Sequence, residues 1–159
     1  MFRSLLACLL ACSLVSGATA AQDRKPPYWA SIASGEARMR TGPALTYPAV
    51  WLYKRRDLPI RVVATHPSWR KVEDPDGTTG WMLVSLLSDT RTAIVRRGEP
   101  KLLRRTPSDG AAADYGVQPG VVGRVSRCGG GWCRMDVQGR VGFIRTSEIW
   151  GVDAEEELD

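Results

Sequence analysis

The sequence is poor in the side chains that catalysis and metal binding most often use. Among 159 residues there is one histidine, His66, and there are four cysteines. Nucleophilic catalysis of the Cys/His type needs a free thiolate beside an imidazole, and structural zinc usually takes about four Cys or His ligands. His66 lies in a Thr-His-Pro-Ser turn that we expect on the surface. We therefore predict no catalytic residue, no metal ion and no cofactor.

Long apolar runs are absent as well. The apolar run over residues 5–15 is shorter than the about 20 residues that a helix needs to cross a bilayer. No later segment approaches that length, and no long stretch after residue 20 shows the amphipathic period of a helix. These absences exclude a transmembrane segment in the mature chain and argue against a helical fold.

Residues 1–20 have the three zones of a cleavable signal peptide. A positive charge near the start is followed by the apolar run and by the small residues Ala18-Thr-Ala20. We expect cleavage after Ala20 and a periplasmic or secreted protein. Lipidation is the alternative, because the residues before Cys8 and before Cys12 loosely resemble a lipobox.

The charge balance excludes one class of partner. Lys and Arg number 22 against 17 Asp and Glu, which gives a formal net charge of +5. In the cell envelope the anionic partners within reach are envelope polymers, lipid head groups and acidic proteins, so nucleic acid is not expected. Solvated faces are the other interpretation of the charge clusters, which are Lys54-Arg55-Arg56, Arg96-Arg97, Arg104-Arg105 and the acidic residues 152–159.

An internal repeat divides the chain. It predicts two homologous domains, residues 28–88 and residues 91–151, followed by an acidic tail at residues 152–159. The matched segments are Trp69-Arg-Lys-Val with Trp132-Cys-Arg-Met, Gly77-Thr-Thr-Gly80-Trp81 with Gly139-Arg-Val-Gly142-Phe143, Ala30-Ser-Ile32 with Thr92-Ala-Ile94, and Arg40-Thr41 with Arg105-Thr106.

Within each domain the pattern is that of short strands. Runs with a period of two residues are separated by turns rich in Gly, Pro and Asp, which predicts an all-β fold of two small antiparallel barrels. Asp76-Gly77 and Gln138-Gly139 are typical hairpin turns. Gly80 and Gly142 are expected where two backbones lie too close for a Cβ atom. Residues 84–87 and 146–149 are expected to form one helical turn in each barrel.

A Trp-centred strand, a turn, Gly-x-x-Gly with Trp or Phe, and a short closing turn together resemble the bacterial SH3 domain. The resemblance implies two tandem SH3-like β-barrels of five strands each after the cleaved signal peptide, export, and binding of envelope material or protein. Bacterial SH3 domains often accompany a peptidase or amidase domain, and this sequence contains none. The segments that more narrowly resemble secreted SH3-like proteins of alphaproteobacteria are Arg38-Met-Arg-Thr-Gly-Pro43, Tyr47-Pro48-Ala-Val-Trp51-Leu-Tyr53, Arg55-Arg-Asp-Leu-Pro59 and Trp150-Gly-Val152.

The two cysteines outside the signal peptide are Cys128 and Cys133, which flank Gly129-Gly-Gly-Trp132. They can face each other across a hairpin, and an exported protein favours their oxidation, so a disulfide is predicted. A structural bridge closing so short a loop would add roughly 2 kcal/mol of stability. A redox-active pair is the alternative.

The candidate ligand-binding residues all lie in the first domain, since residues 111–119 of the second are poorer in large side chains. Residues that alternate along a strand share a face, so a groove lined by aromatic rings and edged by cations could hold an extended peptide or glycan-peptide strand. The alternative is that the aromatic side chains fill the core or the contact between domains. The candidates are Tyr47, Trp51, Tyr53, Lys54, Arg55 and Arg56.

We therefore predict a non-catalytic exported binding module, not an enzyme, that recognises peptidoglycan or an envelope protein. The first domain would bind the ligand, and the second, with its disulfide, would provide stability. The alternative is a regulatory or scaffold subunit of a periplasmic complex, such as one containing a cell-wall hydrolase. Turn chemistry explains acidic residues such as Asp74 and Asp76. The oligomeric state is left open.

Overall fold

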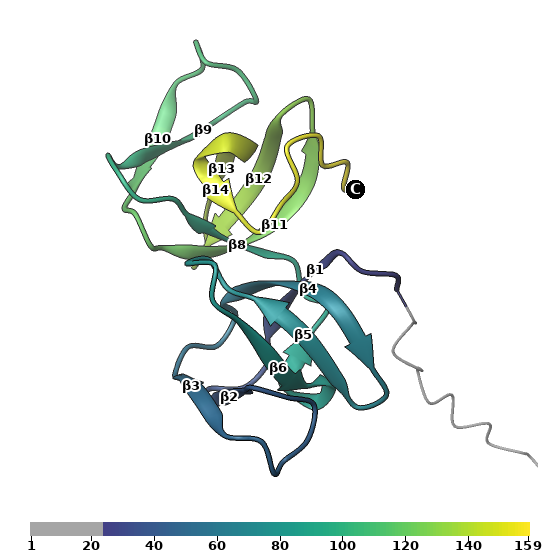
Figure 1. The fold of residues 1–159 in the computed structure, drawn as a ribbon. Coiled ribbons are helices and arrows are strands. Elements are labelled where there is room, and N and C mark those ends of the chain that lie inside the picture. The colour runs from purple at the N-terminus through teal and green to yellow at the C-terminus, as the bar shows by residue number, and fades with distance from the viewer. Residues whose placement is uncertain (1–23) are drawn as a thin grey trace, which may run out of the picture.

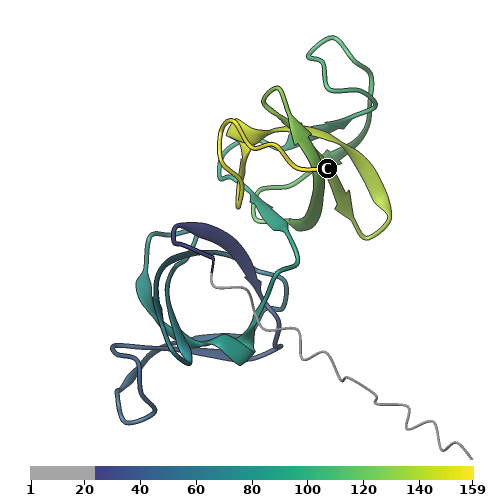
Figure 2. The same cartoon turned by 90° about the vertical axis from the view of Figure 1, so that its right-hand side faces the viewer.

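The computed structural model describes residues 24–159, which fold into two small antiparallel β-barrels (Figure 1). The predicted signal peptide and Cys8 and Cys12 lie outside the described residues. Figure 2 looks along the axis of the first barrel, whose strands form a ring, with the second barrel above it. No helix within residues 24–159 is long and apolar enough to span a membrane.

The first barrel is one seven-stranded sheet in the order β3-β2-β6-β5-β4-β1-β7, so the five strands implied by the resemblance are wrong in number. A single 3₁₀ turn, η1, lies at residues Val84–Leu86, where one helical turn is expected from the sequence. The strands are β1 (Tyr28–Ile32), β2 (Ala37–Arg40), β3 (Ala49–Tyr53), β4 (Pro59–His66), β5 (Trp69–Glu73), β6 (Thr79–Leu83) and β7 (Leu87–Ser88).

The second barrel repeats this topology, with the order β10-β9-β13-β12-β11-β8-β14 and a 3₁₀ turn η2 (Thr146–Glu148). The predicted duplication and all-β fold are therefore confirmed. The strands are β8 (Thr92–Val95), β9 (Lys101–Arg104), β10 (Ala113–Val117), β11 (Val122–Gly129), β12 (Trp132–Val137), β13 (Arg140–Arg145) and β14 (Ile149–Trp150).

Strand register defines which positions of the two barrels correspond, and we call such positions counterparts. Ala30 pairs with Ile60 in the first barrel and Ala93 pairs with Gly123 in the second, so Ala93 is the counterpart of Ala30. The sequence match of Ala30 with Thr92 is wrong by one residue. It followed the identity of Ile32 and Ile94, whereas a buried valine at residue 95 takes the place of Ile32.

The match of Arg40-Thr41 with Arg105-Thr106 is also wrong by one residue. Arg40 pairs with Trp81, and Arg104 pairs with Phe143 at the same place in the second barrel. Both arginines have the same function. Arg40 donates from Nη1 to the carbonyl of Tyr47 at 2.7 Å, and Arg104 donates to the carbonyl of Ala111 at 2.7 Å. Each therefore ties the loop before the third strand of its barrel.

Each barrel encloses an apolar core of about ten side chains that point inward from every strand. Val72 and Met82 of the first core have Met135 and Ile144 as counterparts in the second. Trp69 and Trp132 are buried and Trp81 is half-buried, as expected of core or rim residues. Apolar burial at about 25 cal/mol per Å² is the main stabilising term in domains of this size.

The glycine predictions are confirmed by the geometry. A Cβ atom on Gly80 would lie 2.3 Å from Cγ of Met39, and one on Gly142 would lie 2.6 Å from Cβ of Leu103. Gly77 and Gly139 have φ angles of 83° and 85°, the left-handed region that these hairpin turns require. Two positions per barrel therefore depend on glycine, one for close approach and one for the turn.

Cys128 and Cys133 form the predicted disulfide across β11 and β12, and both are buried. Residues 152–159 fold back over this end of the second barrel. The amide of Leu158 donates to the carbonyl of Cys128 at 3.0 Å, and Glu156 pairs with Arg91 at 2.8 Å. Burial of both sulfur-bearing residues fits a structural bridge, and the acidic tail is part of the folded barrel.

The two barrels pack directly on each other. The rings of Trp29 in β1 and Trp150 in β14 meet edge to face with centroids 4.8 Å apart. Ile94 and Val122 of the second barrel pack against the core of the first. A Cβ atom on Gly151 would lie 3.0 Å from Cβ of Pro59 in the first barrel. The contact between barrels is therefore close and largely apolar.

Candidate functional site

A cleft of about 830 Å³ lies between the two barrels. One wall comes from β3, the segment after it and the β5–β6 turn of the first barrel. The other wall comes from β8, residues 96–97, Gly120 and Trp150 of the second. Four of the six predicted binding residues line this cleft, namely Trp51, Tyr53, Lys54 and Arg55.

Trp51 is the principal exposed aromatic residue of the cleft, with 57% of its surface accessible. As expected for alternating strand residues, its ring lies near that of Tyr53, with centroids 6.3 Å apart. The half-buried ring of Trp150 lines the opposite wall. The cleft therefore presents aromatic surface from both barrels.

Tyr53 belongs to the core rather than to the exposed surface, since only 6% of it is accessible. Its hydroxyl donates to Oδ2 of Asp74 at 2.7 Å. Burial, followed by the hydrogen bond and charge of Asp74, raises the pKa of the Tyr53 phenol well above its usual range. For this residue the alternative interpretation, a core side chain, is the one that the structure supports.

Asp74 is the partner that the sequence did not reveal, because turn chemistry alone seemed to explain it. Its Oδ1 accepts the backbone amides of Asp76 at 3.0 Å and Thr78 at 2.8 Å. This is the expected turn role. Its second oxygen is buried against Tyr53, so the same carboxylate joins the β5–β6 turn to β3 below the floor of the cleft.

Cations surround the cleft, and two of them also bridge the barrels. Arg55 donates from Nη2 to the carbonyl of Gly120 at 2.8 Å. Arg97 pairs with Asp76 at 2.8 Å, and both side chains are largely exposed, so this pair adds little stability. Lys54 is exposed and makes no ion pair among residues 24–159. The rim is therefore predominantly positive.

Two predicted residues lie elsewhere. The ring of Tyr47 lies against Gly42 in the loop between β2 and β3, and Arg56 lines a separate polar hollow of about 470 Å³ with Arg124 and Asp136. The predicted set is therefore split, and only part of it shares one cavity.

The second barrel contributes cleft residues that sequence reasoning did not assign to the site, namely Ile94, Arg96, Arg97 and Trp150. The Arg96-Arg97 pair is visible in the sequence as a charge cluster, and Trp150 as part of the family resemblance. Neither observation places them opposite Trp51, because that depends on how the barrels pack on each other.

The residues that the sequence offers for metal or Cys/His chemistry within residues 24–159 lie as follows. No group of three or more His, Cys, Asp or Glu within residues 24–159 is placed to hold a metal ion. His66 is exposed, with its ring 6.3 Å from that of Trp81. Cys128 and Cys133 are joined to each other, so neither offers a thiolate.

The fold and the internal repeat define a tandem SH3-like protein. Comparison with known families then identifies the particular family. The family described as bacterial SH3 domain matches residues 33–89 and again residues 97–151. The chain belongs to this family. No curated protein matches the chain with significance.

Solved structures with some likeness include three proteins of the NlpC type. NlpC2 from Trichomonas vaginalis is 12% identical with a TM-score of 0.36, over 80% of this chain and 49% of that one. NlpC1 from the same organism is 11% identical with a TM-score of 0.37, over 80% and 47%. An NlpC/P60 family protein from Bacillus cereus ATCC 10987 is 13% identical with a TM-score of 0.34, over 77% and 55%. This chain spans about half the length of each, and likeness at this level carries no argument about function.

Proposed function

We propose that this protein is a non-catalytic module of the cell envelope that binds peptidoglycan through the cleft between its two barrels. The observation that carries the proposal is the pairing of Trp51 and Trp150 on opposite walls of one cleft with a rim of cations. Family membership supports it, because bacterial SH3 domains are generally binding modules.

The chemistry of the cleft suits a glycan-peptide strand. Aromatic rings stack on the apolar faces of extended ligands, and the carboxylates of a peptide stem pair with arginine and lysine. Lys54 and Arg55 lie on one wall and Arg96 and Arg97 on the other, so an anionic segment would find positive charge on both sides. A non-catalytic role accounts for the cleft without requiring any reactive group.

Co-sedimentation with purified sacculi tests the proposal. We expect Trp51→Ala to weaken binding several-fold. This corresponds to a binding free energy of about 0.5–1.5 kcal/mol, the typical contribution of one aromatic contact. Tyr115→Ala is the matched control. Tyr115 is the counterpart of Trp51, because it pairs with Leu103 as Trp51 pairs with Met39. It is 40% exposed and lies outside the cleft. Absence of pelleting at low salt, or equal loss in both variants, would contradict the proposal.

A second function, docking of an envelope protein, is favoured by a different observation. Several large apolar side chains are exposed on the β2–β3 hairpin, including Leu45 at 67%, Val50 at 47% and Leu52 at 39%. An apolar surface of this kind is typical of protein-protein contact. Crosslinking in the periplasm would support a regulatory or scaffold subunit if it recovers one protein in stoichiometric amount while sacculi bind nothing. A Leu45→Ser, Val50→Ser variant should then lose that partner.

A further inference from the structure

The two barrels differ at one end, and their register shows which residues take each other's places there. In the first barrel Tyr28 pairs with Val62. In the second barrel Arg91 is the counterpart of Tyr28, and its carbonyl accepts a hydrogen bond from the amide of Val125, the counterpart of Val62. The cross-strand pair Thr65 and Arg70 takes the place of the disulfide between Cys128 and Cys133. η1 begins at Val84 where η2 begins at Thr146. The same end is therefore built from different side chains in each barrel.

In the second barrel this end is covered by the chain's own acidic tail. Arg91 pairs with Glu156 at 2.8 Å, and both side chains are less than one-fifth exposed, at 19% and 11%. Thr146 donates from Oγ1 to the carbonyl of Ala154 at 3.1 Å, and Leu158 donates to the carbonyl of Cys128 at 3.0 Å. A turn-containing segment with a carboxylate thus occupies this position.

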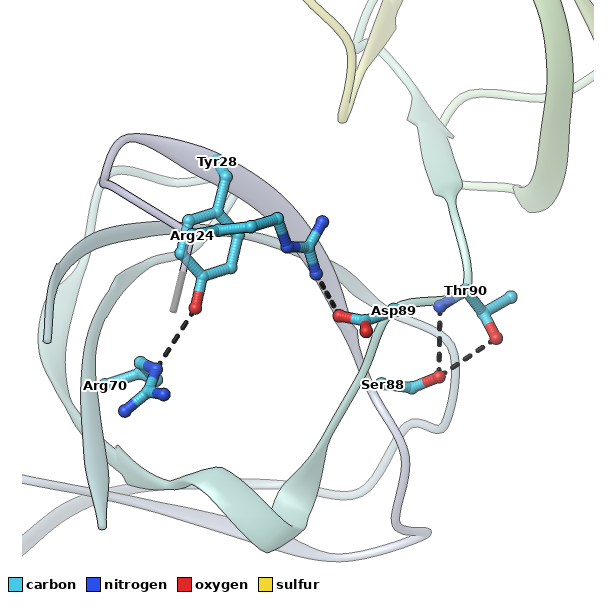
Figure 3. A network of polar contacts seen from close by, with 6 residues as sticks. All are labelled: Arg24, Tyr28, Arg70, Ser88, Asp89 and Thr90. Atoms are coloured by element: carbon cyan, nitrogen blue, oxygen red, sulfur yellow. Dashed lines mark hydrogen bonds and ion pairs between the residues drawn. The ribbon is translucent and has the colours of Figure 1, made fainter. Parts of the chain in front are cut away.

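In the first barrel the counterparts line an open pocket of about 110 Å³. Figure 3 shows Arg24, Tyr28 and Arg70 within the outline of the barrel, with the Arg24 guanidinium directed at Asp89. Arg24 also lies over the ring of Tyr28, 4.6 Å from its centroid. Val84, the counterpart of a tail-binding residue, lies on the same pocket wall.

Arg70 is a buried cation whose observed partners are all neutral. It is 6% exposed, and its Nε donates to the hydroxyl of Tyr28 at 3.1 Å. Its Nη1 donates to the carbonyls of His66 and Trp69, each at 3.0 Å. Within residues 24–159 it makes no ion pair. A buried guanidinium without a carboxylate partner gains more than an exposed one from acquiring an anion.

We propose that this end of the first barrel is a binding site for a peptide carboxylate, held by Arg70 and Arg24. The ligand is an acidic peptide that lies on the first barrel as residues 152–159 lie on the second. Its carboxylate accepts from Nη2 of Arg70, the guanidinium nitrogen that makes no hydrogen bond within residues 24–159, and competes with Asp89 for Arg24. The carboxylate comes either from a chain terminus or from an acidic side chain. This site is separate from the cleft between the barrels.

Nuclear magnetic resonance of the purified protein tests the site directly. The probes are N-acetylglycine, which has a terminal carboxylate, N-acetylglutamate amide, which has a side-chain carboxylate, and N-acetylglutamine amide, which has neither. We expect a saturable shift of the Arg70 Nε–Hε resonance with at least one acid. The neutral probe should bind at least tenfold more weakly. Arg91 is the internal control, because Glu156 already occupies it and its resonance should not move.

Two variants test the site further. Neither changes Arg70, because its hydrogen bonds to the carbonyls of His66 and Trp69 also hold the turn at residues 66–69. Arg24→Gln should weaken binding of the acid several-fold, and Asp89→Asn should tighten it because the competing carboxylate is gone. Equal shifts with acid and neutral probes, no shift at Arg70, or tighter binding by Arg24→Gln would each overturn the proposal. Binding of sacculi by the cleft is not affected by any of these results.

Discussion

The phenol of Tyr53 donates a hydrogen bond of 2.7 Å to the buried carboxylate of Asp74 in the first barrel. In the second barrel the counterparts are Val117 and Val137, and both pack with the apolar core. One barrel therefore joins its third strand to the β5–β6 turn by a polar contact where the other uses apolar packing. Val117 could be read from the sequence as a core residue, but the link between Tyr53 and Asp74 could not.

Removing the Tyr53 hydroxyl should destabilise the first barrel. Tyr53→Phe leaves one oxygen of Asp74 buried without its donor, so we expect a loss of about 1–2 kcal/mol in urea unfolding. Asp74→Ala should cost more, because it also removes the acceptor of two backbone amides. Tyr115→Phe, on an exposed ring, is the control and should change stability by less than about 0.5 kcal/mol. Equal stability of Tyr53→Phe and the native protein would contradict this reading of the contact.

The disulfide should stabilise the second barrel by roughly 2 kcal/mol, the value expected for so short a loop. The Cys128→Ala, Cys133→Ala variant should therefore unfold at lower temperature, and reduction of the native protein should lower its Tm by a similar amount. Loss of protection at the Leu158 amide in hydrogen exchange should accompany either change, because that amide donates to Cys128. A native protein whose Tm does not change under full reduction would refute the structural role.

The tail contact should depend on pH. Burial raises the pKa of Glu156, but the hydrogen bond of Arg91, the hydrogen bond from the Asp153 amide and the charge of Arg91 together outweigh it and hold the pKa below its ordinary value. Because the pKa of Glu156 is lower in the folded than in the unfolded state, its ionised carboxylate contributes to the free energy of unfolding. This contribution is fully present above the unfolded-state pKa of about 4.3 and is lost as the pH falls through the folded-state pKa. The stability difference between native protein and Glu156→Gln should thus be constant from pH 7 to 5 and disappear as the pH falls through the folded pKa of Glu156. A difference that grows on acidification would show the opposite linkage.

Gly151 should not tolerate a side chain. Its φ angle is 122°, and a Cβ atom would lie 2.4 Å from the carbonyl oxygen of Thr92 and 3.0 Å from Cβ of Pro59 in the other barrel. We expect Gly151→Ala to cost more than about 2 kcal/mol in urea unfolding, from backbone strain together with the clash. Gly35→Ala is the control, since nothing lies within 4 Å of its Cβ position. Near-native stability of Gly151→Ala would contradict the strain and the clash.

Local patterns allowed much of the fold to be predicted. Turn dipeptides and period-two runs are patterns of residues close in sequence, and the two cysteines lie in one hairpin. The barrels, the close approach at Gly80 and the disulfide could therefore all be predicted. Register is finer, because a shift of one residue exchanges the two faces of a strand. The sequence repeat matched Ile32 with Ile94 because the two residues are identical. In the structure Val95 takes the place of Ile32, and Ile94 packs against the core of the first barrel.

The candidate site was predictable only in part. Strand alternation showed that Trp51 and Tyr53 share a face, but not that one is exposed and the other covered. Tyr53 packs in the core of the first barrel, and its hydroxyl donates to Asp74, a residue 21 positions further along the chain. The opposite wall of the cleft, with Trp150, depends on the packing of two barrels, and no pattern within one barrel encodes that arrangement.

The edge-to-face contact of Trp29 with Trp150 joins the first strand of one barrel to the last strand of the other. Trp150 also forms part of the cleft wall, so the residue that holds the barrels together is one that a ligand would touch. A fragment containing either barrel alone has only one of the two walls and exposes a tryptophan that is otherwise covered. The smallest piece of this protein worth expressing for screening ligands of the cleft is therefore the intact pair, because dissection by domain would separate the two walls.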